Sequence, residues 1–184
     1  MVDQIYNEIK DQMQKTIDYY QKETSKIRTG RASASMLDAV QVDYYGTAQP
    51  LKNVSHVSIP EPQLIVITPF DPSSLEMIES AIMSSDLGMS PSNDGNVIRL
   101  NIPALTEERR KELVKFLHKT IEEGRISVRN IRRDGNDQIK KLQNDEGMSE
   151  DNVKIELGNI QDLTNDFIEK LNTLQSIKEK EIMG

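Results

Sequence analysis

The segment from Thr106 to Leu142 constrains the fold more than any other part of the chain. It contains no proline, and as one helix it would extend for about 55 Å at about 1.5 Å per residue. Thr106 is a suitable N-cap, and Glu107 and Glu108 follow where the helix dipole favours acidic side chains. Apolar or small residues recur in steps of three or four at Leu113, Leu117, Ile121, Gly124, Val128, Ile131, Gly135, Ile139 and Leu142. A helical stripe of this length requires partner helices of similar length.

Two glycines interrupt this stripe, Gly124 and Gly135. A glycine inside a helix costs about 1 kcal/mol relative to alanine, so each needs a reason. We expect that they allow neighbouring helices to approach closely, and contact with a ligand is the alternative.

Two further segments have the periodicity that partner helices need. The first covers residues 2–29 and ends before Gly30, a favourable residue just beyond a helix C-terminus. Its stripe consists of Val2, Ile5, Ile9, Met13, Ile17, Tyr20, Thr24 and Ile27. The other follows Ser149, a suitable N-cap, with Val153, Leu157, Ile160, Thr164, Phe167, Leu171 and Leu174. Because the connection at 143–148 is short, the helices that it joins should be antiparallel. The three segments predict an elongated antiparallel three-helix bundle.

The middle of the chain, residues 31–104, has a different character, with frequent prolines and glycines. Val40, Val42 and Tyr44 alternate before a turn, Val54, Val57 and Ile59 indicate a second strand, and residues 63–68 form a β-branched run. Asp71 and Pro72 should start a helix that ends at Gly88. We expect Leu75, Ile78, Ile82 and Met83 to face inward from it. A turn at 91–95 and a last strand at 97–102 complete a small β/α/β module, so the fold class is α+β.

This layout predicts a bundle made of residues 1–30 and 105–184, with residues 31–104 inserted between its first two helices. The inserted domain is therefore attached by two adjacent connections. Such a pair permits a hinge but limits twisting. The predicted hinge residues are Thr29, Gly30, Arg31, Pro103, Ala104 and Leu105.

Composition excludes several classes of function. The chain has no cysteine, and its two histidines, His56 and His118, belong to no metal-binding or nucleophile motif. We expect no metal, no cofactor and no catalysis, with His118 at the surface or between helices. The longest apolar run, residues 64–67, is far shorter than the ~20 residues of a membrane span, and the N-terminus has no apolar signal core. These features predict a soluble cytoplasmic protein without membrane contact.

Charge is distributed unevenly along the chain. The net charge is −7, yet residues 125–141 contain six basic and two acidic side chains. Arg125, Arg129 and Arg132 share one helical face, with Arg133 beside it. This face can bind phosphates, or its arginines can pair with acids on neighbouring helices. Lys26, Arg28 and Arg31 form a second basic group near the hinge, in which Arg28 and Arg31 are a candidate second RNA contact. Since no aromatic residue lies among the arginines, structured RNA is a better partner than stacked single strands.

Five segments resemble the bacterial ribosome recycling factor family, in order and at that family's spacing. They are KIRTGRAS, YYGTAQPL, SSDLGMSP, LTEERRKELVK and VRNIRRDGND, and the resemblance extends over the whole chain. One departure is Ala34, where many members carry proline after the RAS sequence. It concerns only the stiffness of that connection.

The resemblance implies an L-shaped molecule with a three-helix bundle and a small β/α/β domain. We expect the free protein to be a monomer. It implies binding between the ribosomal subunits after termination. With elongation factor G and GTP, such a protein splits the ribosome and frees messenger and transfer RNA, while the elongation factor hydrolyses the GTP. The family's small domain faces elongation factor G and the small subunit. The family's arginines that contact large-subunit ribosomal RNA correspond to Arg129, Arg132 and Arg133, and Arg125 lies on the same face.

Two other classes remain open from the residues alone. A coiled-coil scaffold or holdase that binds only protein predicts arginines buried in ion pairs between helices, without ribosome association. A small enzyme that uses the inserted domain predicts a concave polar pocket there, which no motif marks.

Overall fold

The computed structural model describes residues 2–184 and divides them into two compact units. One unit contains the residues up to Arg28 together with Glu107–Gly184, and the other contains Thr29–Thr106. The boundaries therefore differ slightly from positions 30 and 105, because the residues at 29, 30, 105 and 106 belong to the inserted unit. Met1, the first residue of the expected bundle, lies outside the described residues.

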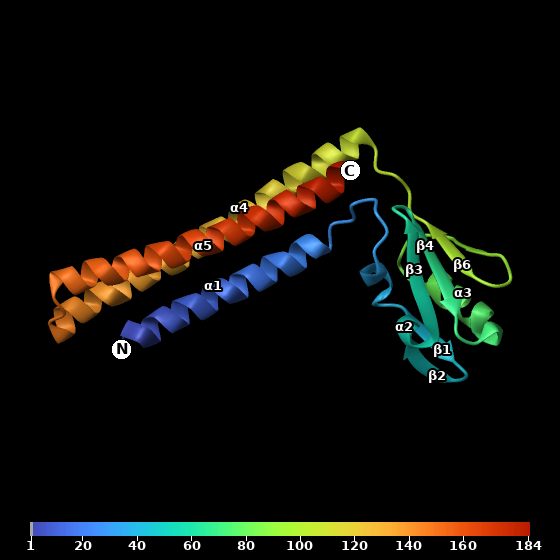
Figure 1. Cartoon of the computed structure of the whole chain (residues 1–184), viewed down its shortest axis with the longest axis horizontal. Coiled ribbons are helices and arrows are strands. Elements are labelled where there is room, and N and C mark those ends of the chain that lie inside the picture. Colours follow the sequence, from blue (N-terminus) through green and yellow to red (C-terminus); the bar gives the residue numbers. More distant parts are fainter. Residues whose placement is uncertain (1) are drawn as a thin grey trace. The chain divides into compact units, whose positions relative to one another are not determined.

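The first unit is the expected three-helix bundle, made of α1 (Val2–Ser25), α4 (Glu107–Glu146) and α5 (Glu150–Met183). The helices lie side by side, and α4 is antiparallel to both α1 and α5 (Figure 1). Ser149 caps α5 as predicted, because its hydroxyl accepts a hydrogen bond from the Asn152 amide at 3.3 Å. In residues 2–184, no helix is long and apolar enough to cross a membrane.

Two helix ends differ from the prediction. The first helix ends at Ser25 rather than near 29, and a tighter turn follows in which the Ile27 amide donates to the Thr24 carbonyl. Ile27 nevertheless remains in the bundle core. The helix α4 continues to Glu146, beyond the predicted loop start at 143, so the connection to α5 is shorter than expected. Gly147, with a φ of +69°, makes this short turn possible because glycine adopts positive φ without strain.

The bundle core follows the predicted stripes. Its buried side chains come from all three helices and include Met13, Leu117 and Phe167. A Cβ placed on Gly135 would lie 2.2 Å from Ile9 Cδ1, and one on Gly124 would lie 3.0 Å from Tyr20 Cδ2. Both glycines therefore mark close approach between helices, as predicted.

The inserted unit contains a hairpin, a four-stranded sheet and one longer helix. The hairpin joins β1 (Gln41–Tyr44) to β2 (Thr47–Pro50), and α2 (Leu51–Val54) leads into β3 (Ser55–Glu61). The sheet has the order β3, β4 (Leu64–Pro69), β6 (Ile98–Asn101), β5 (Pro91–Asn93), with every pair antiparallel. Short 3-10 helices lie at Ala34–Leu37 and Pro72–Ser74, and α3 (Leu75–Ser84) follows the second of them. Ile65 faces Leu100 and Ile67 faces Ile98 across β4 and β6, and all four are buried in the core with Ile78 and Ile82 of α3.

Three expectations for this unit were wrong in detail. Met83 does not face inward, since 69% of its surface is exposed. The helix ends at Ser84, before Gly88, where the Ser85 amide donates to the Ile82 carbonyl. Residues 91–93 form the edge strand β5 rather than a turn. The turn itself begins at Asp94, whose carboxylate accepts hydrogen bonds from the Asn96 and Val97 amides.

Candidate nucleic-acid interface

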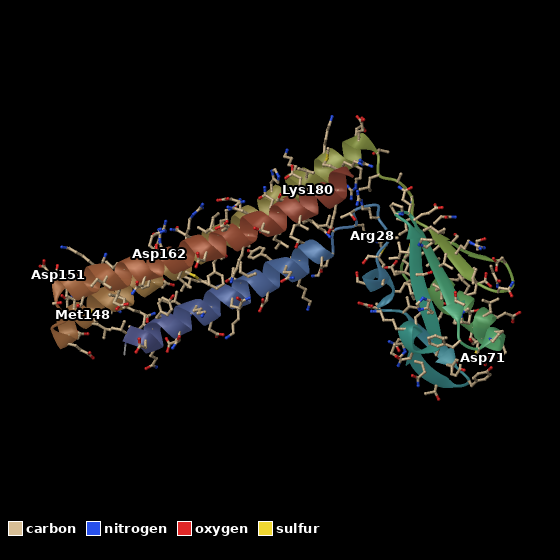
Figure 2. All side chains as sticks on the ribbon, in the orientation of Figure 1. Arg28, Asp71, Met148, Asp151, Asp162 and Lys180 are labelled. Carbon is tan, nitrogen blue, oxygen red and sulfur yellow. The ribbon has the colours of Figure 1, made fainter. Side chains whose placement is uncertain are left out.

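The helix α4 carries the predicted basic face, but the structure divides its arginines into two kinds. Arg125 and Arg129 have a carboxylate partner, whereas Arg132 and Arg133 form no ion pair within residues 2–184. Arg132 contacts Gln161 of α5. The next residue, Asp162, is labelled in Figure 2 and shows how far along the bundle Arg132 and Arg133 lie.

Arg125 ties α4 to α5. Its Nε and Nη2 donate to Asn172 Oδ1 at 2.9 and 2.7 Å, and Nη2 also donates to Gln175 Oε1 at 2.8 Å. Its Nη1 donates to Glu122 at 2.9 Å, and only 18% of the side chain is exposed. Because every nitrogen of this guanidinium is already bonded, Arg125 is poorly placed to bind a phosphate.

Arg129 shares the same carboxylate as Arg125. Its Nη1 donates to Glu122 Oε1 at 2.9 Å, while 42% of its side chain is exposed. Hydrogen bonds from Arg125 and then from Arg129 hold the pKa of Glu122 below its ordinary value. One carboxylate therefore compensates two arginines, and Arg129 keeps an accessible guanidinium.

Arg132 and Arg133 carry the least compensated charge of this face. Arg132 Nη1 donates to the amide oxygen of Gln161 on α5 at 2.9 Å, and its buried Nε has no partner among the described residues. Arg133 is exposed and makes no hydrogen bond or ion pair with any part of residues 2–184. Two adjacent positive charges are thus available on an otherwise acidic chain.

The second basic group does not form one cluster within a single unit. Lys26 Nζ forms an ion pair with Glu23 Oε1 at 2.5 Å, and both residues belong to the bundle unit. Arg28 is the last residue of the bundle unit before the boundary, whereas Arg31 belongs to the inserted unit. Both arginines are exposed, and their role in RNA binding stays a prediction.

Both chain connections are fastened to the same turn of the inserted unit. The Ala32 amide donates to the Pro62 carbonyl at 2.7 Å, and the Ile102 amide donates to the Gln63 carbonyl at 2.9 Å. The predicted hinge residues 29–31 and 103–105 lie just beyond these two attachment points. Gly30 has a φ of +71°, and a Cβ there would stand 2.9 Å from Leu105 Cγ. The two connections therefore touch each other at Gly30 and Leu105.

A model of the ribosome recycling factor family matches residues 20–183. The chain belongs to this family. Its function is ribosome recycling in translation. A ribosome-recycling factor of Bacillus licheniformis is 48% identical over 100% of this chain and 99% of its own length. That of Bacillus subtilis is 45% identical with the same coverage, and that of Clostridioides difficile is 48% identical over 98% of this chain and 97% of its own.

Solved structures agree with this membership. A solution structure of the ribosome recycling factor aligns with a TM-score of 0.78 at 43% identity, covering 99% of this chain and 97% of that one. Another structure describes models for the T. thermophilus ribosome recycling factor and the E. coli elongation factor G bound to the E. coli post-termination complex. Its chain aligns with a TM-score of 0.68 at 41% identity, over 100% of both chains. The resemblance of the five sequence segments to the family is thereby confirmed.

Sequence reasoning missed the partners of the arginines. Glu122 could have been identified from the sequence, because a carboxylate three residues before Arg125 and seven before Arg129 lies on the same helical face. The α5 partners Gln161, Asn172 and Gln175 had no such signal. They lie far from the arginines in sequence, and only the rotation of α5 about its axis decides which of its side chains face α4.

Proposed function

We propose that this member of the ribosome recycling factor family acts with elongation factor G and GTP to split the post-termination ribosome, releasing messenger and transfer RNA. In this proposal, Arg129, Arg132 and Arg133 bind phosphates of large-subunit ribosomal RNA. Exposed Arg133 beside Arg132, neither of them with a carboxylate partner in the described chain, is the observation that carries the RNA contact. The related structure that pairs a recycling factor with elongation factor G on the post-termination complex supports the partners.

Physical chemistry supports phosphate as the ligand of this face. A guanidinium stays charged at any relevant pH and presents a fork of donors that matches phosphate oxygens. Binding of this kind releases counterions and weakens with salt. The net charge of −7 disfavours indiscriminate RNA binding, so the main contact is proposed for the local basic face of α4. Arg125, whose nitrogens are all bonded within the bundle, contributes by fixing α5 against α4.

The inserted unit is proposed to receive the action of elongation factor G and to change its angle at the hinge. A hinge needs a few residues that absorb backbone rotation between firmly held segments. Hydrogen bonds of Ala32 and Ile102 to the 62–63 turn hold one side, and α1 and α4 hold the other. The stiff bundle then transmits the movement to the RNA that it binds.

The chain itself is proposed to be neither a GTPase nor any other enzyme, and to need no cofactor. Its two histidines support this, since His118 Nε2 contacts Glu179 between α4 and α5, and His56 lies exposed on β3. No group of three or more metal-ligating side chains occurs in residues 2–184. GTP turnover by the purified protein without elongation factor G would contradict this part of the proposal.

The test of RNA binding uses Arg132→Ala and Arg133→Ala, with Lys119→Ala as the control. Lys119 is also an exposed cation of α4, outside the arginine face. Cosedimentation with ribosomes over a range of salt concentrations gives affinity and its salt slope. Each arginine variant should bind more weakly, with a slope lower by about one unit per lost phosphate contact. Circular dichroism should show unchanged folding, because Arg133 is exposed and Arg132 makes a single hydrogen bond to a neutral amide.

The same experiment examines the scaffold alternative. That function predicted arginines buried in ion pairs between helices, and Arg125 comes closest to it, although its partners on α5 are neutral amides. If both arginine variants and the Lys119 control bind ribosomes like the parent protein with the same salt slope, the arginine face is structural and the RNA-binding proposal is wrong.

A further inference from the structure

Arg125 and Arg132 of α4 meet neutral acceptors on α5. The oxygens that face Arg125 are Asn172 Oδ1 and Gln175 Oε1, and the oxygen that faces Arg132 is Gln161 Oε1. Acidic residues occur along α5, as at Asp162 and Asp166, yet neither forms an ion pair with these arginines. The contact between the two helices is thus made with amides at the positions where a carboxylate would also reach.

An amide and a carboxylate have different effects on an arginine that must bind phosphate. Both accept a hydrogen bond at about 2.9 Å, but only the carboxylate brings a negative charge. A carboxylate partner would offset the field of the guanidinium and would itself repel an approaching phosphate. An amide oxygen orients the guanidinium and leaves its whole charge available.

Within residues 2–184, Gln161 is the partner that holds Arg132. Arg132 Nε is buried without a hydrogen bond in the described chain, so this nitrogen does not anchor the side chain. The bond from Nη1 to Gln161 Oε1 is therefore what fixes the direction of the guanidinium. Gln161 is itself oriented, because its Nε2 donates to Asn165 Oδ1 at 2.8 Å. That donation turns the amide so that its oxygen points at Arg132.

We propose that Gln161, oriented by Asn165, is a positioning residue that aims Arg132 at an RNA phosphate while leaving its charge uncompensated. This inference rests on the proposed RNA-binding function of Arg132. It extends the functional surface from α4 to α5, and it makes the neutrality of position 161 a requirement for binding.

The test compares Gln161→Glu, which keeps the shape and the acceptor but adds a negative charge, with Gln161→Met, which keeps the length and removes the acceptor. Both variants lose the donor to Asn165, so this loss does not distinguish them. Gln12→Glu is the matched control, because Gln12 is an exposed glutamine of α1 and its side chain makes no bond within residues 2–184. All variants are measured for cosedimentation with ribosomes over a salt series and for thermal unfolding by circular dichroism. Arg132→Ala is measured in parallel.

Gln161→Glu should lower the affinity about tenfold or more, as for loss of one hydrogen bond to a charged group, and reduce the salt slope by about one unit. Gln161→Met should lower the affinity less and leave the salt slope unchanged, because Arg132 keeps its charge but its guanidinium is no longer oriented by a hydrogen bond. Gln12→Glu should bind like the parent protein. Unfolding temperatures should agree for all variants. If Gln161 had a purely structural role, its substitution would instead lower the unfolding temperature.

Two kinds of failure are distinguishable. If Arg132→Ala weakens binding but Gln161→Glu does not, the inference is wrong and the proposed function stands. The inference is also wrong if Gln12→Glu weakens binding equally, or if Gln161→Met matches Gln161→Glu in affinity and slope. If Arg132→Ala itself has no effect on affinity or slope, the proposed RNA contact of Arg132 fails, and the inference fails with it.

Discussion

The bundle and the inserted unit use similar buried residues but arrange them differently. In the bundle, each helix contributes one stripe, and every level along it repeats the same kind of contact, as at Met13, Leu117 and Phe167. In the inserted unit, β4, β6 and α3 converge on one small cluster that includes Ile67, Ile98 and Ile78. Removing one side chain from the bundle therefore disturbs packing mainly at its own level, whereas removing one from the cluster disturbs packing against every element around it. This difference suits the proposed roles of the two units, in which the bundle binds RNA through its arginines and the inserted unit moves at the predicted hinge.

The largest expected effect tests whether the two units are separate folding units. Ile67→Ala removes a fully buried side chain from the inserted cluster and should cost about 2–5 kcal/mol of its free energy of unfolding. Because most helical residues belong to the bundle, circular dichroism at 222 nm in urea should retain most of its signal after methyl NMR signals of the inserted unit have collapsed. Leu117 is also fully buried, so Leu117→Ala is the matched bundle variant. In this variant the circular dichroism signal should be lost while the methyl signals of the inserted unit remain. Coincident transitions in both variants would mean that the units unfold as one.

The next effect concerns how closely the bundle helices approach one another. A methyl group on Gly135 would overlap Ile9 Cδ1, and Ile9 is itself buried, so overpacking should cost up to about 3 kcal/mol. Alanine returns about 1 kcal/mol of helix propensity, which leaves Gly135→Ala less stable by about 2 kcal/mol. A methyl group on Gly158 of α5 would have no neighbouring atom within 4 Å, so Gly158→Ala should gain up to about 1 kcal/mol. Thermal unfolding measures the stability of both variants. Equal changes in unfolding temperature would show that the bundle is not tightly packed at Gly135.

The two units also differ in how far the sequence alone predicted them. Bundle faces were predictable because three- and four-residue steps persist over many turns and average out single exceptions. In the short helix α3, one exception matters, and apolar Met83 proved to be exposed. The edge strand at 91–93 was missed because proline, serine and asparagine have low strand propensity and its form depends on pairing with β6. The basic face followed from spacing, but its α5 partners required the packed structure.

A smaller effect compares two glycines with positive φ, one at the predicted hinge and one in the hairpin turn. Alanine at Gly30 or at Gly46 should cost about 1–2 kcal/mol, because both adopt the left-handed conformation. Only Gly30 has a neighbour, since its methyl group would press on Leu105, whereas nothing lies within 4 Å at Gly46. We expect Gly30→Ala to keep ribosome binding but slow ribosome splitting by elongation factor G. The Gly46→Ala variant should support ribosome splitting at the normal rate. Equal splitting rates with the two variants would contradict a hinge at Gly30.

The smallest effect separates the two units by the pH dependence of two carboxylates. Hydrogen bonds from the Val97 and Asn96 amides, and then from Arg99, lower the pKa of Asp94 from 3.8 to about 2. Since the folded pKa is below the unfolded one, Asp94 stabilises the inserted unit above pH 3.8, and this contribution disappears as the pH falls toward 2. Glu122 of the bundle has its pKa lowered from 4.5, mainly by the arginine side chains Arg125 and Arg129, so its contribution disappears below pH 4.5.

The donors of the two carboxylates predict different responses to salt. Added salt screens exposed side-chain charges, so it should reduce the acid sensitivity that Glu122 confers on the bundle more than the sensitivity that Asp94 confers on the inserted unit. Urea unfolding of Asp94→Asn and Glu122→Gln between about pH 2 and 6, at low and high salt, measures this. Each variant should flatten the pH dependence of its own unit only. If Asp94→Asn flattened the bundle transition instead, the assignment of these carboxylates to separate stability units would be wrong.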